Sequence, residues 1–278
     1  MAPNIKHVFG RDAVSQVLEA PKVGAGGLFD LTGKVAVITG SSRGIGRAIA
    51  ERMADQGARV VISSRKPGPC DEVAAGINAK RPGHAIAVPA NISSKEDLQR
   101  LMDETRKAFG QIDILVCNAA SNPYYGSQLE ISDEAFSKIL SNNIIANNWM
   151  IQMVAPEMKA RMDGSIIVIS SIGGLRGTEV IGAYAISKAA DMQLARNLAR
   201  ELGPFNIRIN CVAPGLVKTD FAKALWDTPA GEERASSGTP LRRLGEPDDL
   251  AGAAVYLASR AGAWTTGQTI VVDGGSTC

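Results

Sequence analysis

The sequence predicts a single α/β domain built on a doubly wound, parallel, seven-stranded sheet with helices on both faces. Two observations carry this prediction. Short apolar runs alternate along the 278-residue chain with longer segments of helical periodicity, which is typical of a parallel sheet. Several short runs, such as 112–117 and 165–169, are almost wholly apolar, as expected for strands buried on both faces. The length suits one large domain, and we find no repeat, linker or second domain.

The elements are expected in alternation after a polar N-terminal arm. We assign residues 1–33, which contain a Gly-rich run at 24–27, to the arm and residues 34–278 to the folded domain. Strands are expected at 35–39, 59–63, 85–88, 112–117, 165–170, 207–211 and 269–273. Helices are expected at 44–56, 70–80, 95–109, 133–160, 182–203 and 247–259. In the first helix Ile45, Ile49 and Met53 recur four residues apart and therefore share one face.

The composition argues against several classes of partner. The net charge is +2 and no basic run is present, so we expect neither nucleic acid nor an anionic membrane as a partner. No apolar stretch has the length of a membrane span, and the N-terminus lacks the apolar core of a secretory signal. The four cysteines, Cys70, Cys117, Cys211 and Cys278, have no metal-ligand spacing, and we expect no metal. Buried thiols at Cys117 and Cys211 and a reducing, cytoplasmic location are expected.

The turn between the first strand and the first helix is the first candidate site. It reads Thr39-Gly40-Ser41-Ser42-Arg43-Gly44-Ile45-Gly46. A strand, a glycine turn and a helix present free backbone N–H groups to a phosphate, which makes the predicted fold Rossmann-like. Gly40 would let the chain turn sharply, and Gly44 and Gly46 would leave room for a pyrophosphate and for close helix–sheet packing. The spacing Gly-x-x-x-Gly-x-Gly is neither the commoner dinucleotide fingerprint nor a P-loop.

The same residues also fit a second motif. Residues 40–44 read Gly-x-Ser-x-Gly, the nucleophile elbow of a hydrolase. That interpretation needs a histidine late in the chain, whereas His7 and His84 both lie in the first third. The nucleotide-binding interpretation is therefore favoured.

The end of the second expected strand indicates which nucleotide is bound. Ser64 and Arg65 follow the glycine turn by about 20 residues, where a dinucleotide fold meets the adenosine ribose. No acidic residue stands there to accept a hydrogen bond from a free 2′-hydroxyl. Ser64, Arg65 and the nearby Arg43 suit a 2′-phosphate, because guanidinium groups pair bidentately with phosphate. We expect NADP(H) to be preferred and NAD(H) to be possible; the alternative is that Arg65 is a solvated surface arginine.

Two further strand ends carry polar residues. The fourth expected strand ends in Asn118-Ala119-Ala120, where Asn118 either contacts a cofactor or has a structural role in the turn. The fifth ends at Ser171 and is followed by a Tyr184-x-x-x-Lys188 motif. Residues four apart on a helix lie one above the other, and a nearby ammonium makes a phenol, with a pKa of ~10 when free, more acidic. Such a tyrosine is a usable acid or base for alcohol–carbonyl interconversion.

Together these motifs resemble the short-chain dehydrogenases/reductases of the classical subgroup. The resemblance covers about residues 30–275 and also includes Pro214-Gly215 with Thr219. It implies that Tyr184 is the general acid/base, that Lys188 acidifies it and binds the nicotinamide ribose, and that Ser171 holds the substrate oxygen. It implies further that Asn143 anchors a water of the proton relay, although the neighbouring Asn142 could take this place.

The resemblance also implies the cofactor contacts. These are Gly40, Ser42, Arg43, Gly44, Ile45 and Gly46 in the glycine turn, Ser64 and Arg65 at the ribose, Asn91 and Ile92 beside the adenine, Asn118 and Ala119, Tyr184 and Lys188, and Pro214, Gly215, Val217 and Thr219 on the nicotinamide side. Two positions depart from the family pattern. The usual Asn-Asn-Ala-Gly is Cys-Asn-Ala-Ala here, and the acid often found after the third strand is Asn91.

Within the family, residues 118–123 and 213–221 look most like the carbonyl reductases of the dehydrogenase/reductase member 4 type. We therefore expect hydride transfer between a nicotinamide and the carbonyl carbon of a ketone or aldehyde. A homotetramer or homodimer is implied by the resemblance, through 133–160, 182–203 and the C-terminal segment.

The substrate is the least specified part of the prediction. We expect Tyr124 and Tyr125 and a lid at about 217–235 to close the pocket, with Phe221, Leu225 and Trp226 favouring an apolar or aromatic substrate. The alternative is that these side chains pack at a subunit interface. Two other functions are compatible with these motifs: a 3-oxoacyl carrier-protein reductase of the same family, and an NADP(H)-binding redox sensor without turnover. The complete Ser171, Tyr184 and Lys188 set argues against the sensor.

Overall fold

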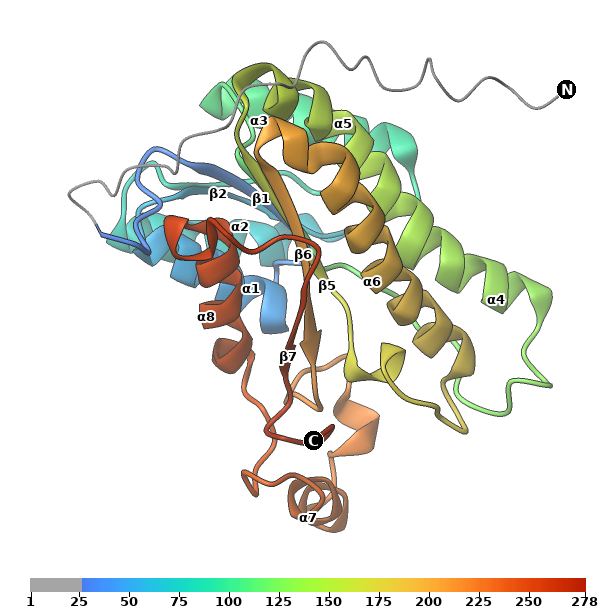
Figure 1. Ribbon diagram of the computed structural model, residues 1–278. Coiled ribbons are helices and arrows are strands. Elements are labelled where there is room, and N and C mark those ends of the chain that lie inside the picture. The colour runs from blue at the N-terminus through green and yellow to red at the C-terminus, as the bar shows by residue number, and fades with distance from the viewer. Residues whose placement is uncertain (1–26) are drawn as a thin grey trace, which may run out of the picture.

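Seven parallel strands form one sheet in the computed structural model, which describes residues 27–278 (Figure 1). The strand order is β3-β2-β1-β4-β5-β6-β7. The predicted α/β fold class is confirmed. Of the predicted arm at 1–33, residues 1–26 lie outside the described residues. The strands are β1 (Val35–Thr39), β2 (Arg59–Ser63), β3 (Ala85–Ala87), β4 (Ile114–Cys117), β5 (Gly164–Ile169), β6 (Ile207–Pro214) and β7 (Thr269–Val272).

Helices cover both faces of this sheet (Figure 1). On one face lie α1 (Gly44–Asp55), α2 (Pro67–Lys80) and α8 (Pro247–Ala258). On the other lie α3 (Lys95–Phe109), α5 (Ala146–Arg161) and α6 (Gly182–Leu202). The remaining helices are α4 (Asp133–Leu140), which precedes α5, and α7 (Pro229–Ser237), which follows β6.

The wholly apolar strands are explained by this sandwich. Successive strand residues point to opposite faces, so Val37 and Val61 enter the core under α3, α5 and α6. Ile38 and Ile62 enter the core under α1, α2 and α8. All four side chains are 0% exposed. A strand with helices on both sides therefore has no solvated face for polar residues.

The order of the strands reverses between β1 and β4, which are neighbours in the sheet. In doubly wound sheets, ligands bind beyond the carboxyl ends of the strands at such a switch point. The glycine-rich residues 40–46 follow the carboxyl end of β1, and Asn118 follows the carboxyl end of β4. Both turns therefore lie at the switch point. The topology thus brings together two candidate segments that are far apart in the sequence.

The largest differences from the sequence-based expectation concern three elements, and the other bounds agree to within two residues. The helix expected at 133–160 is interrupted by a π-helical turn, Ser141–Ile145, between α4 and α5. A π-helical turn of this kind occurs as a single widened turn inside a longer helix, and no sequence signal that we used distinguishes it. β6 continues to Pro214 instead of 211, and α2 begins at Pro67 instead of 70, with proline in its first turn.

The lid expected at 217–235 contains a helix that we did not predict. Thr228 caps α7 by accepting a hydrogen bond from the Gly231 N–H through Oγ1, and Pro229 stands in its first turn. These are ordinary helix start signals, but α7 is short and has no apolar face of its own. The sequence of α7 therefore lacks the hydrophobic periodicity that would have predicted a helix.

The described end of the arm packs on the domain. Leu31 is 1% exposed and its N–H donates to the Gln56 carbonyl after α1. Cys117 and Cys211 are buried free thiols, as expected, and Cys70 is buried as well. None of the described helices combines the length and apolar character needed to cross a bilayer.

Candidate active site

The glycine turn after β1 has the backbone that its sequence predicts. Gly40 and Gly44 have φ angles of +66° and +55°, a region that side chains with a Cβ rarely adopt. A Cβ on Gly46 would lie 2.5 Å from both Asn118 Nδ2 and the Gly40 carbonyl oxygen. Gly46 therefore permits the close approach of α1 to the turn.

The N-terminus of α1 suits an anion. Arg43, at the N-cap, provides no side-chain cap, and the first turn has no acidic residue. Among the described residues, the N–H groups of residues 44–46 have no hydrogen-bond partner. Unpaired N–H groups and the positive end of the helix dipole form a phosphate-binding geometry. The turn therefore fits the pyrophosphate of a dinucleotide.

The asparagine after β4 fastens this turn. Asn118 Nδ2 donates to the carbonyls of Thr39 at 2.8 Å and Gly40 at 3.2 Å. The backbone N–H groups of Asn118 and Ala119 both donate to Thr39 Oγ1 at 3.1 Å. Of the two interpretations of Asn118, the geometry favours the structural role. Thr39 was not singled out from the sequence, because its Oγ1 gains these donors only when β1 and β4 pair.

The residues expected near the adenosine have unequal surroundings. Ser64 is half-buried with its Oγ 3.1 Å from Cys70 Sγ. Arg65 is exposed and forms no ion pair within residues 27–278. Arg43, in contrast, is paired with Asp220, Nη1 to Oδ2 at 2.9 Å. Asn91 is exposed, and its Oδ1 accepts from the Ser93 N–H at 3.1 Å, while Ile92 packs partly against the core.

Tyr184 and Lys188 lie one turn apart near the start of α6. Lys188 Nζ is 5.6 Å from the centroid of the Tyr184 ring, so the predicted i,i+4 pair shares one side of the helix. Ser171 follows β5, and its Oγ accepts from the Gly173 N–H at 3.0 Å at the start of a short 3₁₀ turn, Ile172–Gly174. A Cβ on Gly174 would lie 2.6 Å from the Ala189 nitrogen, so glycine lets this turn rest on α6.

The two candidate relay asparagines point to different partners. Asn143 is 0% exposed in the π-helical turn, and its Nδ2 donates to Ser187 Oγ of α6 at 3.0 Å and to the Ser121 carbonyl at 3.1 Å. Asn142 Nδ2 donates to Ser121 Oγ instead. Asn143 therefore connects to the Tyr184 helix, which favours it over Asn142. Its carbonyl accepts from Asn147 Nδ2 at 2.6 Å.

A buried carboxylate beside Lys188 was missed by the sequence reasoning. Lys188 Nζ donates to Asp191 Oδ2 at 3.1 Å and to the Ile169 carbonyl at 2.8 Å. Burial opposes the charge on Lys188, but Asp191 and Tyr184 more than offset this effect and hold the pKa of Lys188 above its ordinary value. The i,i+3 spacing was visible in the sequence, but the burial of Asp191 was not.

The segment after β6 joins the two halves of the site. The Gly215 N–H donates to the Val272 carbonyl at 3.0 Å directly after Pro214, and Val217 is 4% exposed. A Cβ on Gly44 would meet Thr219 Cγ2 at 3.2 Å. Two residues later, the Phe221 ring centroid lies 6.0 Å from that of Tyr184. This segment therefore contacts both the glycine turn and the candidate catalytic tyrosine.

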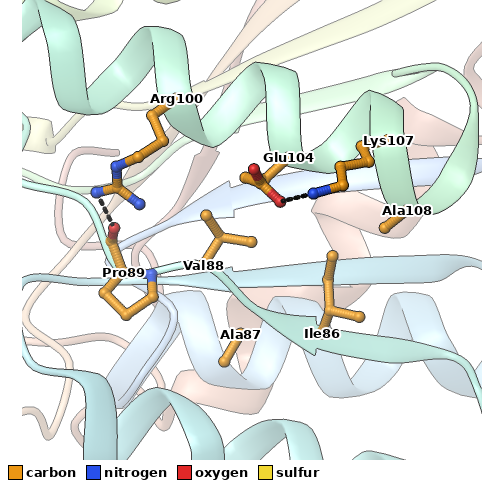
Figure 2. Close-up of a pocket in the computed structure, with 8 residues that line it drawn as sticks. All are labelled: Ile86, Ala87, Val88, Pro89, Arg100, Glu104, Lys107 and Ala108. Atoms are coloured by element: carbon orange, nitrogen blue, oxygen red, sulfur yellow. Dashed lines mark hydrogen bonds and ion pairs between the residues drawn. The ribbon is translucent and has the colours of Figure 1, made fainter.

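A separate pocket lies between β3 and α3 (Figure 2). It has a volume of about 470 Å³, and Arg100 and Lys107 project from α3 above Ile86 and Val88. Arg100 donates to the Pro89 carbonyl there. None of the predicted site residues lines this pocket.

Comparison with known proteins finds several to which this chain is similar. A family model described as enoyl-(acyl carrier protein) reductase matches residues 40–277. The dehydrogenase/reductase SDR family member 4 of Oryctolagus cuniculus is 43% identical over 247 residues, covering 88% of this chain and 94% of the relative. The same protein of Homo sapiens is 42% identical over 249 residues, covering 88% of each chain. A solved 7α-hydroxysteroid dehydrogenase, complexed with NADH and 7-oxo glycochenodeoxycholic acid, is 37% identical with a TM-score of 0.84, covering 89% of this chain and 95% of its own.

Proposed function

Because the chain belongs to the short-chain dehydrogenase/reductase family, we propose that it interconverts a ketone or aldehyde and the alcohol with NADP(H), using Tyr184 as general acid/base. Family membership makes it an oxidoreductase of small-molecule carbonyls and alcohols that uses a nicotinamide nucleotide; the preferred nucleotide and the acid/base are our additions. The single observation that carries the acid/base is the Tyr184–Lys188 pair, with Nζ 5.6 Å from the ring centroid. The nucleotide preference rests separately on the residues after β2.

The residues of the glycine turn fit the nucleotide. The unpaired N–H groups at the start of α1 would bind the pyrophosphate, with the turn held by Asn118. Arg65, exposed and without a carboxylate partner among the described residues, would bind a 2′-phosphate together with Ser64. Arg43 would join them by exchanging Asp220 for the phosphate. These three side chains supply one hydroxyl and two guanidinium groups, and the loop after β2 has no acidic residue at 64–66 to compete with a phosphate. This combination favours NADP(H) over NAD(H).

Each catalytic side chain has one task. A bound nicotinamide supplies the hydride in reduction and accepts it in oxidation. Ser171 holds the substrate oxygen by hydrogen bonding, and Tyr184 gives its proton to that oxygen as the carbonyl is reduced. In alcohol oxidation Tyr184 takes the proton back. Lys188 stabilises the phenolate that is left, and Asn143 links the π-helical turn to α6 for the onward relay of the proton.

The surroundings of Tyr184 favour an apolar or aromatic substrate. Phe221 lies against Tyr184 and is 56% exposed, so its ring is available to a ligand. Leu225 and Tyr125 are also exposed, at 40% and 63%. One relative of known structure is complexed with 7-oxo glycochenodeoxycholic acid, which carries an oxo group. A panel of substrates should therefore include cyclic and aryl ketones.

Two alternatives are tested by the same panel. The family model carries the description of an acyl carrier protein reductase, which keeps a 3-oxoacyl thioester among the candidate substrates. The redox-sensor hypothesis requires that no substrate of the panel is turned over, and the relatives, which are named as enzymes, argue against it.

We also propose a homotetramer or homodimer in a reducing, cytoplasmic compartment. Ile145, before α5, and Ile186, on α6, are 42% and 48% exposed, while Val271 on β7 is 40% exposed. Apolar side chains that remain exposed on the helices and edge expected to associate support such contacts. The cysteines of residues 27–278 are all free, which supports a reducing compartment. Sedimentation velocity tests the oligomeric state.

The decisive experiment follows nicotinamide absorbance with each nucleotide across a panel of ketones, aldehydes and 3-oxoacyl thioesters. We expect NADPH-dependent reduction of an apolar ketone or aldehyde. Arg65→Gln should raise the KM for NADPH by about 10-fold or more, as expected for a lost charged hydrogen bond, and leave the KM for NADH unchanged. An enzyme that clearly prefers NADH would refute the nucleotide preference.

A further inference from the structure

A buried ion pair lies beside the proposed acid/base. Lys188 and Asp191 are 2% and 0% exposed, and the Lys188 Nζ to Asp191 Oδ2 distance is 3.1 Å. Asp191 Oδ1 accepts from Asn147 Nδ2, also at 3.1 Å. Both carboxyl oxygens therefore face donors. A protonated carboxyl group would need an acceptor for its own proton, so this pattern is that of an ionised carboxylate, although burial raises the pKa of Asp191 above its ordinary value.

The orientation of Asn147 supports the same charge state. Its Nδ2 lies between two acceptors, the Asn143 carbonyl at 2.6 Å and Asp191 Oδ1 at 3.1 Å. The opposite orientation would place Oδ1 against two acceptors. In the observed orientation Oδ1 is buried without a partner among the described residues. An unsatisfied buried acceptor is costly, so the two donated bonds must outweigh it, and a negative charge on Asp191 makes the bond to Oδ1 stronger.

Within residues 27–278, the elements packed around the pair add no second counter-ion. Tyr184 faces Lys188 from α6, Asn147 approaches from α5, and Cys117 of β4 and Cys211 of β6 lie near the pair. Burial raises the pKa of both thiols, that of Cys211 to about 12, so both stay neutral. Arg196, further along α6, is turned to Gln193 on the surface. Asp191 is therefore the carboxylate that balances Lys188 in this cluster.

We propose that Asp191 is a positioning residue that keeps Lys188 charged in the protein interior, so that a positive charge faces Tyr184 throughout the working pH range. Lys188 donates one N–H to Asp191 and one to the Ile169 carbonyl, which leaves a third for the ribose or the phenolate. A lysine ammonium buried without a counter-ion tends to lose its proton, because burial disfavours the charged form by up to several pKa units. The inference rests on the proposed role of Tyr184.

The test measures the charge of Lys188 directly. The full-length wild type and Asp191→Asn are labelled with ¹³C-lysine, and the ε-carbon signal of Lys188 is assigned by its loss in Lys188→Arg. The wild type and Asp191→Asn are then titrated without nucleotide. In Asp191→Asn we expect Lys188 to titrate at least about 2 pH units below an ordinary lysine, near 10.4. Asp191→Glu should restore the charge at neutral pH. A Lys188 that titrates in Asp191→Asn as it does in the wild type overturns the proposal.

A measurement on the wild type needs no variant to fold. Lys188 should titrate above the ordinary lysine value, and a Lys188 that is neutral near pH 8 in the wild-type protein overturns the proposal.

Kinetics separate a charge effect from a merely structural one. The kcat of Asp191→Asn for carbonyl reduction should recover as the pH falls below the pKa of Lys188, with KM nearly unchanged. A structural defect would lower kcat equally at every pH, and that result also overturns the proposal. The NMR titration needs no substrate. If the wild type turns over no substrate while Lys188 still loses its charge in Asp191→Asn, the proposed function is refuted and the ion-pair inference stands.

Discussion

Arg43 in the glycine turn and Asp220 after β6 form an ion pair, Nη1 to Oδ2 at 2.9 Å, across 177 positions of sequence. Both side chains are exposed, at 69% and 64%, so the pair contributes little to stability. It does, however, occupy the guanidinium that we assign to the 2′-phosphate. On this assignment, binding of NADP(H) replaces the Asp220 carboxylate with the 2′-phosphate as the partner of Arg43.

Removal of this competitor should favour the phosphorylated nucleotide. We expect Asp220→Asn to lower the KM for NADPH by about 2- to 5-fold, which corresponds to the free energy of one exposed ion pair. The KM for NADH should not change, since it has no 2′-phosphate. Asp227→Asn is the control, because Asp227 forms a similar exposed pair with Lys223 at 3.6 Å in the same segment. Equal effects on both nucleotides would contradict the role of Arg43.

Loss of the Tyr184 hydroxyl should stop proton transfer and leave binding intact. Tyr184→Phe should reduce kcat by about 10²- to 10⁴-fold, the usual contribution of a general acid. The nucleotide Kd should change little. Tyr256→Phe is the matched control, since its hydroxyl meets Thr265 Oγ1 at 2.7 Å near the end of α8 and should leave kcat unchanged. A fully active Tyr184→Phe enzyme would end the proposed mechanism.

Much of the fold was predictable because its signals are local. Apolar runs buried on both faces, a glycine turn and the helical period reveal a doubly wound sheet before any tertiary contact is known. The candidate site residues follow from the topology, since ligands bind where strands end. Ser171 and Asn118 were found in this way.

The remaining features depend on contacts between distant segments. Asp191 looks like any helix aspartate until α5 and β6 cover it. The Arg43–Asp220 pair joins residues 177 positions apart. The structural role of Asn118 requires β1 and β4 to be neighbours. Sequence patterns report one element at a time, so they find the elements and not their partners.

The close approach at Gly46 predicts a sharp contrast between two glycines on helices. Gly46→Ala would place a Cβ 2.5 Å from Asn118 Nδ2 and the Gly40 carbonyl. We expect it to reduce the free energy of unfolding by about 1–3 kcal/mol, as overpacking does, and to weaken nucleotide binding. Gly76→Ala on α2 is the control, because no heavy atom of the described residues lies within 4 Å of its added Cβ. It should be neutral or stabilising by up to about 1 kcal/mol, and urea unfolding of both variants measures the difference.

The last prediction concerns Asp249 at the start of α8. Its Oδ2 accepts from the Glu246 N–H at 2.8 Å in a capping box, and both oxygens accept from the Arg243 guanidinium. The Arg243 hydrogen bonds and the Glu246 N–H lower the pKa of Asp249 to about 2. This value is below that of an unfolded aspartate, near 3.9, so ionised Asp249 stabilises the fold above that pH. The stabilisation is lost as the pH falls towards 2.

Asp249→Asn should therefore cost stability mainly at neutral pH. Since the Asp249 side chain is 33% exposed, solvent screening reduces the expected loss at pH 7 to about 1 kcal/mol. The deficit should narrow below about pH 5, because wild-type Asp249 then begins to lose its advantage over the unfolded state.

Asp133→Asn, in the first turn of α4, is the control and should cost less than about 0.5 kcal/mol, because only the helix dipole is involved. Urea titrations at several pH values test this, and a deficit that stays constant down to pH 3 would show that the charge of Asp249 is not its cause.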